Sequence, residues 1–84
     1  MSTNIDVGNL AFSTDSDGLR SLFAQYGEVT SAQVIADRDT GRSRGFGFVE
    51  MTSADEAAKA VSTANGATLD GRQLKVKIAR ELSR

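Results

Sequence analysis

Apolar and polar residues alternate in four short stretches of the chain, which is the pattern of half-buried β-strands. The four predicted strands cover residues 5–7, 29–36, 45–51 and 73–78. In the last of them, Leu74, Val76 and Ile78 are predicted to point inward and the residues between them outward. Each stretch therefore offers one apolar face to a core and one face to solvent.

Two further stretches follow the helical period and begin with capping side chains. Residues 13–15 carry capping oxygens, and Gly27 falls where the first helix should end. Ser53 and Glu56 form a capping box that opens a second helix. The apolar faces comprise Leu19, Leu22 and Phe23 in the first helix and Ala57, Ala60, Val61 and Ala64 in the second.

The resulting element order, β-α-β-β-α-β, predicts an α+β fold of the ferredoxin-like kind. Each helix must bury its apolar face, so a four-stranded antiparallel sheet with both helices on one side is the simplest arrangement. The length of 84 residues fits one domain, which we expect to span residues 1–84 with its core at about 4–80. The other face of the sheet then stays open to solvent.

Two aromatic residues are predicted to lie on this open face. Phe46 and Phe48 are two residues apart in a strand, so both rings project from one side. Val49 and Met51 belong to the inward apolar set, which places the phenylalanines outward. A register slipped by one residue would reverse this assignment. Gathered aromatic rings on a surface usually mark a binding site, and we interpret the glycine before each ring as a point of close ligand approach.

The composition excludes several kinds of site. Without cysteine or histidine, the chain holds no disulfide scaffold, thiol nucleophile or zinc finger, and no metal or other cofactor is predicted. No stretch approaches membrane-spanning length and the N-terminus lacks a targeting pattern. We therefore expect a cytoplasmic protein with no membrane partner.

The net charge of −1 conceals an uneven distribution of charged residues. Residues 1–37 carry five acidic side chains and one arginine, a balance of −4. Residues 72–84 carry five basic side chains and one glutamate, a balance of +4, and end in a basic extension at 80–84. A local excess of cations, more than the total charge, decides whether a surface attracts polyanions.

Residues 44–51, RGFGFVEM, resemble the RNP1 octapeptide of the RNA-recognition motif. Six of its seven specified positions agree, and Met51 departs at the last. Residues 5–10, IDVGNL, stand in the place of the RNP2 hexapeptide. The resemblance covers about residues 4–80 and implies strand order 4-1-3-2, with single-stranded RNA bound on the open face. The loop at 37–43 resembles that of small single-domain proteins of cyanobacteria and other bacteria.

This resemblance implies a role for each matching position. Phe48 would stack on a base and Phe46 would pack against sugars or a neighbouring base, at about 1–3 kcal/mol per stack. Arg44 would pair with a phosphate, and Asn9 would hydrogen-bond near the rim. The other expected RNA contacts are Gln33, Ile35 and Glu50 on the open face, Arg38 and Arg42 in the loop, and Lys75, Lys77 and Arg80 near the C-terminus.

Asp6 departs from the family because it stands where RNP2 has its first stacking aromatic. A carboxylate cannot stack on a base and it repels phosphate. We expect these effects to weaken RNA binding by about 2–4 kcal/mol, roughly 30- to 1000-fold. Salt bridges from Arg44 or Lys77 to Asp6 or Glu50 are an alternative use of these cations in the free protein.

Two other function classes remain open. The fold also suits a protein-interaction module that docks a peptide or a second copy through the sheet, or an engineered scaffold that no longer binds RNA. Asp6 favours this reading, and binding that ignores added oligonucleotide would identify it. An enzyme of the same architecture, such as an acyl-phosphate hydrolase, is disfavoured because the chain lacks histidine, cysteine and a P-loop. The expected nucleic-acid ligands include single-stranded DNA as well as single-stranded RNA.

Overall fold

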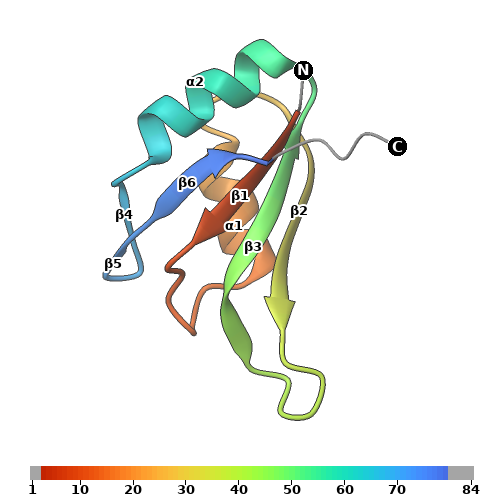
Figure 1. Cartoon of the computed structure of the whole chain (residues 1–84), viewed down its shortest axis with the longest axis vertical. Helices are drawn as coiled ribbons and strands as arrows, with labels where there is room; N and C mark the ends of the chain where they lie inside the picture. Colours follow the sequence, from red (N-terminus) through yellow and green to blue (C-terminus); the bar gives the residue numbers. More distant parts are fainter. Residues whose placement is uncertain (1–2, 80–84) are drawn as a thin grey trace.

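The computed structural model describes residues 3–79, which form a four-stranded antiparallel sheet with two helices on one side (Figure 1). The elements in chain order are β1 (Asn4–Gly8), α1 (Ser16–Phe23), β2 (Val29–Ala36), β3 (Ser43–Met51), α2 (Ala54–Ala64), β4 (Thr68–Leu69), β5 (Arg72–Gln73) and β6 (Lys75–Ile78). The strand order of the main sheet is β2-β3-β1-β6. It confirms the predicted order, since β6 is the fourth strand of that sheet.

The pairing of β1 with β3 fixes which residues face the helices. Ile5 lies opposite Val49, and Asp6 lies opposite Phe48. Ile5 and Val49 are buried, while Phe48 is exposed. Because side chains alternate along a strand, the whole register follows from these two pairs. The predicted register is confirmed and the slipped one is wrong.

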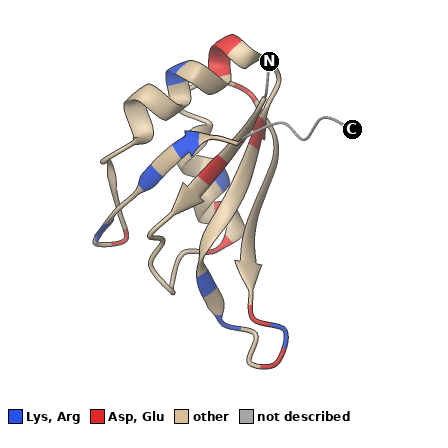
Figure 2. Cartoon of the chain, in the orientation of Figure 1, with Lys and Arg blue, Asp and Glu red and all other residues tan. Residues whose placement is uncertain are grey.

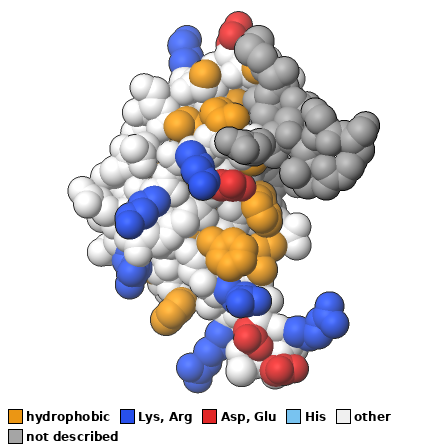
Figure 3. Space-filling model, in the orientation of Figure 1, with side chains coloured by type: hydrophobic (Ala, Val, Ile, Leu, Met, Phe, Trp, Pro, Cys, Tyr) orange, Lys and Arg blue, Asp and Glu red, His pale blue; other side chains and the backbone are white. Residues whose placement is uncertain are grey.

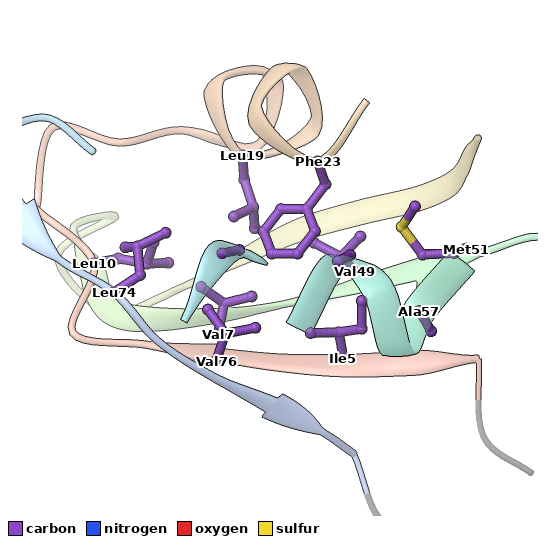
Figure 4. Close-up of a cluster of buried hydrophobic side chains, with 12 residues drawn as sticks. Ile5, Val7, Leu10, Leu19, Phe23, Val49, Met51, Ala57, Leu74 and Val76 are labelled. Carbon is purple, nitrogen blue, oxygen red and sulfur yellow. The ribbon is translucent and has the colours of Figure 1, made fainter. Parts of the chain in front are cut away.

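The core fills the space between the sheet and the helices (Figure 4). Phe23 and Leu19 reach into it from α1 and are fully buried. From α2 it receives the fully buried Ala57, Ala60 and Ala64, whose small side chains allow that helix to lie close to the sheet, and Val61 packs against its edge. The strands and the loop ends supply Ile5, Val7, Leu10, Val49, Met51, Leu74 and Val76.

The two helices begin as predicted, but the first ends early. The Asp15 side chain accepts a hydrogen bond from the Gly18 amide at 2.8 Å and caps α1. This helix ends at Phe23, before the predicted end at Gly27. The Tyr26 amide donates to the Phe23 carbonyl at 3.0 Å, three residues back, so the chain leaves α1 through tighter turns.

The capping box of α2 forms as predicted and is extended by its neighbours. The Ser53 hydroxyl accepts from the Glu56 amide at 3.1 Å. The Glu56 carboxylate accepts from the Thr52 hydroxyl and, at 3.4 Å, from the Glu28 amide. These hydrogen bonds, with that of Thr52 the largest cause, hold the pKa of Glu56 below its ordinary value of 4.5.

The predicted last strand is divided into two. The buried Leu74 donates its amide to the Ala67 carbonyl at 2.8 Å, which separates β5 from β6. Asp70 and Gly71, with φ of 52° and 85°, close the β4–β5 hairpin in the left-handed conformation that such tight turns require. Ile78 pairs directly with the buried Ile5 and so lies on the predicted inward face, but it is still 38% exposed because it ends an edge strand.

The two glycines of β3 also have structural causes, and their role as points of close ligand approach stays a prediction. A Cβ atom on Gly47 would lie 2.4 Å from the Gln33 carbonyl oxygen and 3.2 Å from Leu19 Cδ2. Gly47 therefore faces the core, where a side chain has no room. Gly45 has φ of 86°, which side chains other than glycine rarely adopt. Among residues 3–79, no helix is long and apolar enough to span a membrane.

Candidate nucleic-acid interface

The open face is formed by the outward residues of β2, β3, β1 and β6. Direct strand pairing places Gln33, Phe48, Asp6 and Lys77 side by side in one row, and Phe46, Gly8 and Lys75 in the next. Figure 2 shows the two basic positions on β6 beside the acidic position on β1. The sheet thus brings residues from four separate parts of the chain into one surface.

The two phenylalanine rings of β3 are exposed and fixed relative to each other. Phe46 is 38% exposed and Phe48 is 43% exposed. Their centroids are 6.3 Å apart and their planes are at 85°, an edge-to-face arrangement. The guanidinium carbon of Arg44 lies 6.0 Å from the Phe46 centroid, at the outer limit of a cation–π contact. Two differently oriented apolar surfaces are therefore available to flat ligands.

A shallow hollow of about 630 Å³ lies over β1, β3 and β6. It is lined by Asp6, Val7, Gly8, Phe46, Gly47, Phe48, Asn65, Lys75, Val76 and Lys77. Its volume is within the range of sites that hold small organic groups. Figure 3 shows hydrophobic side chains along the middle of this face, with basic side chains beside them and at the lower end.

Asn65 lines the hollow but was not predicted from the sequence. It follows α2, and its side-chain oxygen accepts a hydrogen bond from the Val76 amide at 3.1 Å. This bond satisfies a free amide on the outer edge of β6. Only the packing of α2 against β6 brings the residue here, so no local pattern could have indicated it.

Asp6 lies at the centre of the open face and is half-buried. Its direct neighbours across the sheet are Phe48 and Lys77. Within residues 3–79, the structure records no ion pair from Arg44 or Lys77 to Asp6 or Glu50. Arg44 and Lys77 are exposed, so in this state their charges are available to an anionic ligand.

Asn9, which was predicted to bind RNA at the rim, is held by the protein itself. Its Nδ2 donates to the Gln73 carbonyl at 2.6 Å, and its Oδ1 accepts from Arg72 Nη2 at 2.5 Å. The residue has φ of 60°, where asparagine is among the better tolerated residues. The Asn9 side chain thereby joins the end of β1 to β5 and brings Arg72 to the rim.

Arg38 and Arg42 are exposed in the β2–β3 loop, which projects past the end of the sheet (Figure 1). Asp37 organises this loop, because its carboxylate accepts from the amides of Asp39 at 2.8 Å and Thr40 at 3.1 Å. These backbone hydrogen bonds, that of Asp39 first, lower the pKa of Asp37. The two arginines are thus carried at one end of the open face.

The remaining predicted contacts are placed as follows. Gln33 is exposed beside Phe48. Glu50 is exposed on β3, between its pairing partners Asn4 on β1 and Ser31 on β2. Ile35 is half-buried and lies in the register shift between Val34 and Ala36. Arg80 lies outside the described residues. Sequence reasoning also missed Phe12, an aromatic side chain in the β1–α1 loop that is 75% exposed.

Comparison with known proteins identifies the family of this domain. The family model for the RNA recognition motif matches residues 5–75. The chain belongs to the RNA recognition motif family. This family and its RNA-binding relatives point to a binding domain and not to an enzyme. Within residues 3–79, no group of three or more acidic, histidine or cysteine side chains is arranged to hold a metal ion.

Relatives of this RNA recognition motif are known from plants. The domain is 49% identical over 83 residues to the mitochondrial glycine-rich RNA-binding protein 4 of Arabidopsis thaliana, covering 99% of this chain and 61% of that protein. It is 48% identical over 83 residues to the chloroplastic 28 kDa ribonucleoprotein of Spinacia oleracea, covering 99% of this chain and 36% of that protein. The chain thus spans less than two thirds of the length of these relatives.

Solved structures agree with the family assignment. The crystal structure of RNA binding protein PG1 has 49% sequence identity and a TM-score of 0.90, with 99% of this chain and 100% of that chain covered. A complex of the Sxl-lethal protein with RNA has 31% identity and a TM-score of 0.90, covering 99% of this chain and 50% of that chain. The fold of this RNA recognition motif is therefore one that also occurs in complex with RNA.

These comparisons also correct two expectations. Relatives named as mitochondrial and chloroplastic contradict the expected cytoplasmic location. The same plant relatives do not support the expected likeness to bacterial proteins. The physical reason is that a folded RNA recognition motif carries the determinants of its fold and its surface, whereas an organellar address is read from a separate targeting segment.

Proposed function

We propose that this RNA recognition motif binds single-stranded RNA on the open face of its sheet. The observation that carries the proposal is the pair of exposed rings, Phe46 and Phe48, held edge-to-face beside Lys75 and Lys77. Stacking of a base on such a ring contributes about 1–3 kcal/mol and accepts any base, because every base has a π-face. The proposed ligand is therefore a short single strand bound with little sequence preference.

The cations around the rings support a polyanionic ligand. Lys75 and Lys77 lie on β6, across β1 from the rings, and Arg44 lies two residues before Phe46 on β3. A strand whose bases stack on the rings would pass its phosphates near these groups. Arg38 and Arg42 would meet a strand that continues past the sheet, and Arg80 is expected to contact a further phosphate. Such contacts make binding depend strongly on salt.

Polar groups on the open face would add weak selectivity to this stacking. Gln33 lies directly beside Phe48 and carries both a donor and an acceptor for base edges. Ile35 would add apolar contact at its edge, and Glu50 would accept hydrogen bonds from exocyclic amines. Asn9 would contribute at the rim mainly by holding Arg72 in place, because both ends of its amide already have partners.

Asp6 would weaken this interaction. It lies directly between Phe48 and Lys77 in one row of the sheet, so its carboxylate is close to any base stacked on Phe48. It replaces a ring that would provide a second stack, and its charge opposes the attraction of Lys77 for phosphate. The net binding is expected to be weaker by about 2–4 kcal/mol than with an aromatic residue at this position.

The family relatives support RNA as the ligand, since several are named RNA-binding proteins. The same stacking and charge would also accept single-stranded DNA, because neither requires the 2′-hydroxyl. A second candidate is docking of a protein or a second copy on the open face. Asp6 and Glu50 favour it, because two carboxylates on this surface suit a basic peptide better than RNA.

The test measures affinity for short single-stranded RNA by fluorescence anisotropy, at low and then at physiological salt. NMR titration of the labelled protein shows which residues respond. We expect shifts at Phe46, Phe48, Lys75 and Lys77 that shrink as salt is added. Asp6→Tyr is expected to tighten binding at least about tenfold, since it adds a stack and removes a negative charge.

Two further variants separate the ring from the charge. Asp6→Asn removes the charge without adding a ring and should tighten binding by less than Asp6→Tyr. Asp55→Asn makes the same change of charge in the first turn of α2, away from the open face, and should leave affinity nearly unchanged. No shifts on the sheet at low salt would refute RNA binding there. Equal RNA affinities for Asp6→Tyr and the unaltered domain would show that Asp6 does not weaken RNA binding.

A further inference from the structure

The β1–α1 loop presents an aromatic ring that the sheet site does not use. Phe12 is 75% exposed, more than either ring on β3. A single exposed apolar side chain needs no explanation on its own. Phe12 differs because its ring lies beside the β3 backbone: a Cβ atom on Gly45 would be 3.9 Å from Phe12 Cε1. Gly45 directly precedes Phe46, so the loop ring lies near the part of β3 that carries the exposed phenylalanines.

The backbone that carries Phe12 is anchored on both sides. The Leu10 amide donates to the Gly45 carbonyl at 2.8 Å, and the Thr14 amide donates to the Ala11 carbonyl at 3.0 Å. Leu10, Ala11 and Thr14 are buried, and the Thr14 hydroxyl also donates to the Asp70 carboxylate at 2.6 Å. Phe12 therefore stands on a fixed turn. A ligand that binds its ring loses little free energy in ordering the loop.

A hollow of about 300 Å³ lies between this ring and the end of β3. It is lined by Asn9, Leu10, Phe12, Arg44, Gly45 and Arg72. The two charged side chains in this lining are both arginines, whereas the hollow over the sheet contains Asp6. Arg72 is held at the hollow by its hydrogen bond to Asn9 Oδ1. The site therefore combines one apolar ring with two positive charges, of which that of Arg72 is held in place by a hydrogen bond.

We propose that Phe12, Arg44 and Arg72 form a second nucleotide subsite, which binds one nucleotide of a single strand after that strand leaves the sheet. The Phe12 ring stacks on the base, and one or both guanidinium groups bind the adjoining phosphate. This inference rests on the proposed function, because the strand reaches the subsite from the rings of β3. It predicts a longer footprint than the sheet alone provides.

The chemistry of the lining favours a nucleotide over a peptide. A guanidinium group donates two parallel hydrogen bonds to phosphate oxygens, a geometry that suits arginine better than lysine. A phosphodiester strand brings a flat base and an anion together at each repeat, which matches the adjacent ring and cations. An acidic peptide would satisfy Arg44 and Arg72 but would leave the Phe12 ring without a stacking partner.

The test compares two RNA lengths, a trinucleotide that covers the sheet rings and an octanucleotide that extends past them. Phe12→Ser is expected to weaken octanucleotide binding at least about fivefold, because one stack is lost. Trinucleotide binding, followed by NMR, should change less than about twofold. Arg72→Gln should likewise affect only the octanucleotide. Lys59→Gln on α2 removes a positive charge away from this surface and serves as the matched control.

A tryptophan variant gives an independent readout. The chain contains no tryptophan, so Phe12→Trp introduces one fluorescent reporter at the subsite. Stacking of a base on the indole ring should quench its emission when the octanucleotide is added. The trinucleotide should leave the emission unchanged. Because Phe12 is exposed, we expect both substitutions of this residue to leave the thermal unfolding midpoint close to that of the unaltered domain.

The outcomes separate this inference from the proposed function. Unchanged octanucleotide affinity in Phe12→Ser, with binding still weakened in Phe48→Ala, would overturn the subsite and leave the sheet function intact. Equal weakening for both lengths would also overturn it, because Phe12 would then belong to the sheet site. If Phe12→Ser changes self-association in sedimentation experiments but not RNA affinity, the ring contacts protein instead of RNA and the subsite is overturned. If the unaltered domain binds neither RNA, the proposed function fails first.

Discussion

The two faces of the central strands are built under different constraints. On the helix side, Ile5, Val49 and Met51 are buried to 1% exposure or less. On the open side, Phe46 and Phe48 keep about two fifths of their surface exposed. The residues alternate along the same strands, so backbone geometry is shared and only the environment differs. The comparison separates what the fold needs from what a ligand would need.

The inner face tolerates little change because its volume is already filled. At Gly47, an added methyl group would meet the Gln33 carbonyl oxygen and Leu19. On the outer face, Asp6 is not part of the core. A substitution there is expected to change binding more than folding. Residues on the open face therefore report on the ligand more directly than core residues do.

The largest expected effect is on stability and comes from a substitution on the inner face. Met51→Ala should lower the free energy of unfolding by about 2–5 kcal/mol, because it leaves a cavity beneath the sheet. Denaturant titration measures the change. Affinity for RNA, measured under conditions where the variant is still folded, should stay close to that of the unaltered domain. A loss of affinity as large as that of an open-face variant would contradict the separation of the two faces.

The next largest effect is on RNA affinity and comes from a substitution on the outer face. Phe48→Ala should weaken binding of single-stranded RNA by about 1–3 kcal/mol, since it removes a stacking ring. The free energy of unfolding should change by less than about 1 kcal/mol, because the ring is exposed and contributes mainly cross-strand contact. Anisotropy titration and denaturant titration of the same sample give both numbers. Unchanged affinity would remove the sheet as the binding surface.

A smaller effect is expected on the salt dependence of binding when a positive charge is removed from the outer face. Lys77→Gln should reduce the slope of log affinity against log salt concentration by about 0.7, the value for one phosphate contact on a single strand. Affinity titrations at four or more salt concentrations measure that slope. Lys59→Gln on α2 removes the same charge from the helix layer and should leave the slope unchanged. Equal slopes in all three proteins would show that Lys77 contacts no phosphate.

The smallest effect concerns a carboxylate that serves folding, in contrast to Asp6. The pKa of Glu56 is lowered in the folded protein, chiefly by the hydrogen bond from Thr52. Its contribution to stability is therefore present above the ordinary glutamate pKa of 4.5 and is lost as pH falls through the lowered value. Glu56→Gln should be less stable at neutral pH and should lose less stability on acidification. Thermal unfolding between pH 7 and pH 3 measures both; identical pH profiles would contradict the assignment.

Local patterns predicted most of the fold. Strand alternation predicted that Phe46 and Phe48 face solvent and that Val49 and Met51 face the core. The capping box predicted the start of α2 at the observed residue. The patterns failed where long-range packing intervenes. The break in the last strand at Leu74 was missed, because its amide donates to Ala67, and Ile78 faces inward but stays partly exposed because it ends an edge strand. Neither position differs from its neighbours in local pattern.

The candidate site was predictable only in part, for a similar reason. The rings and lysines of the open face follow from alternation once the covered face is known. Asn65 and Arg72 reach the surface through contacts with residues 11 and 63 positions away in the chain, and Phe12 is positioned by its closeness to Gly45. Such residues belong to loops, where no periodicity indicates the direction of a side chain.

The sequence by itself determined which side chains each strand offers to either face and where the helices begin. These features depend on periodicity and capping, which act between residues close in the chain. Only the tertiary structure decided that Asp6 lies between Phe48 and Lys77, that Gly47 has no room for a side chain, and that two arginines meet beside Phe12. Those relations join distant segments, and packing alone sets them.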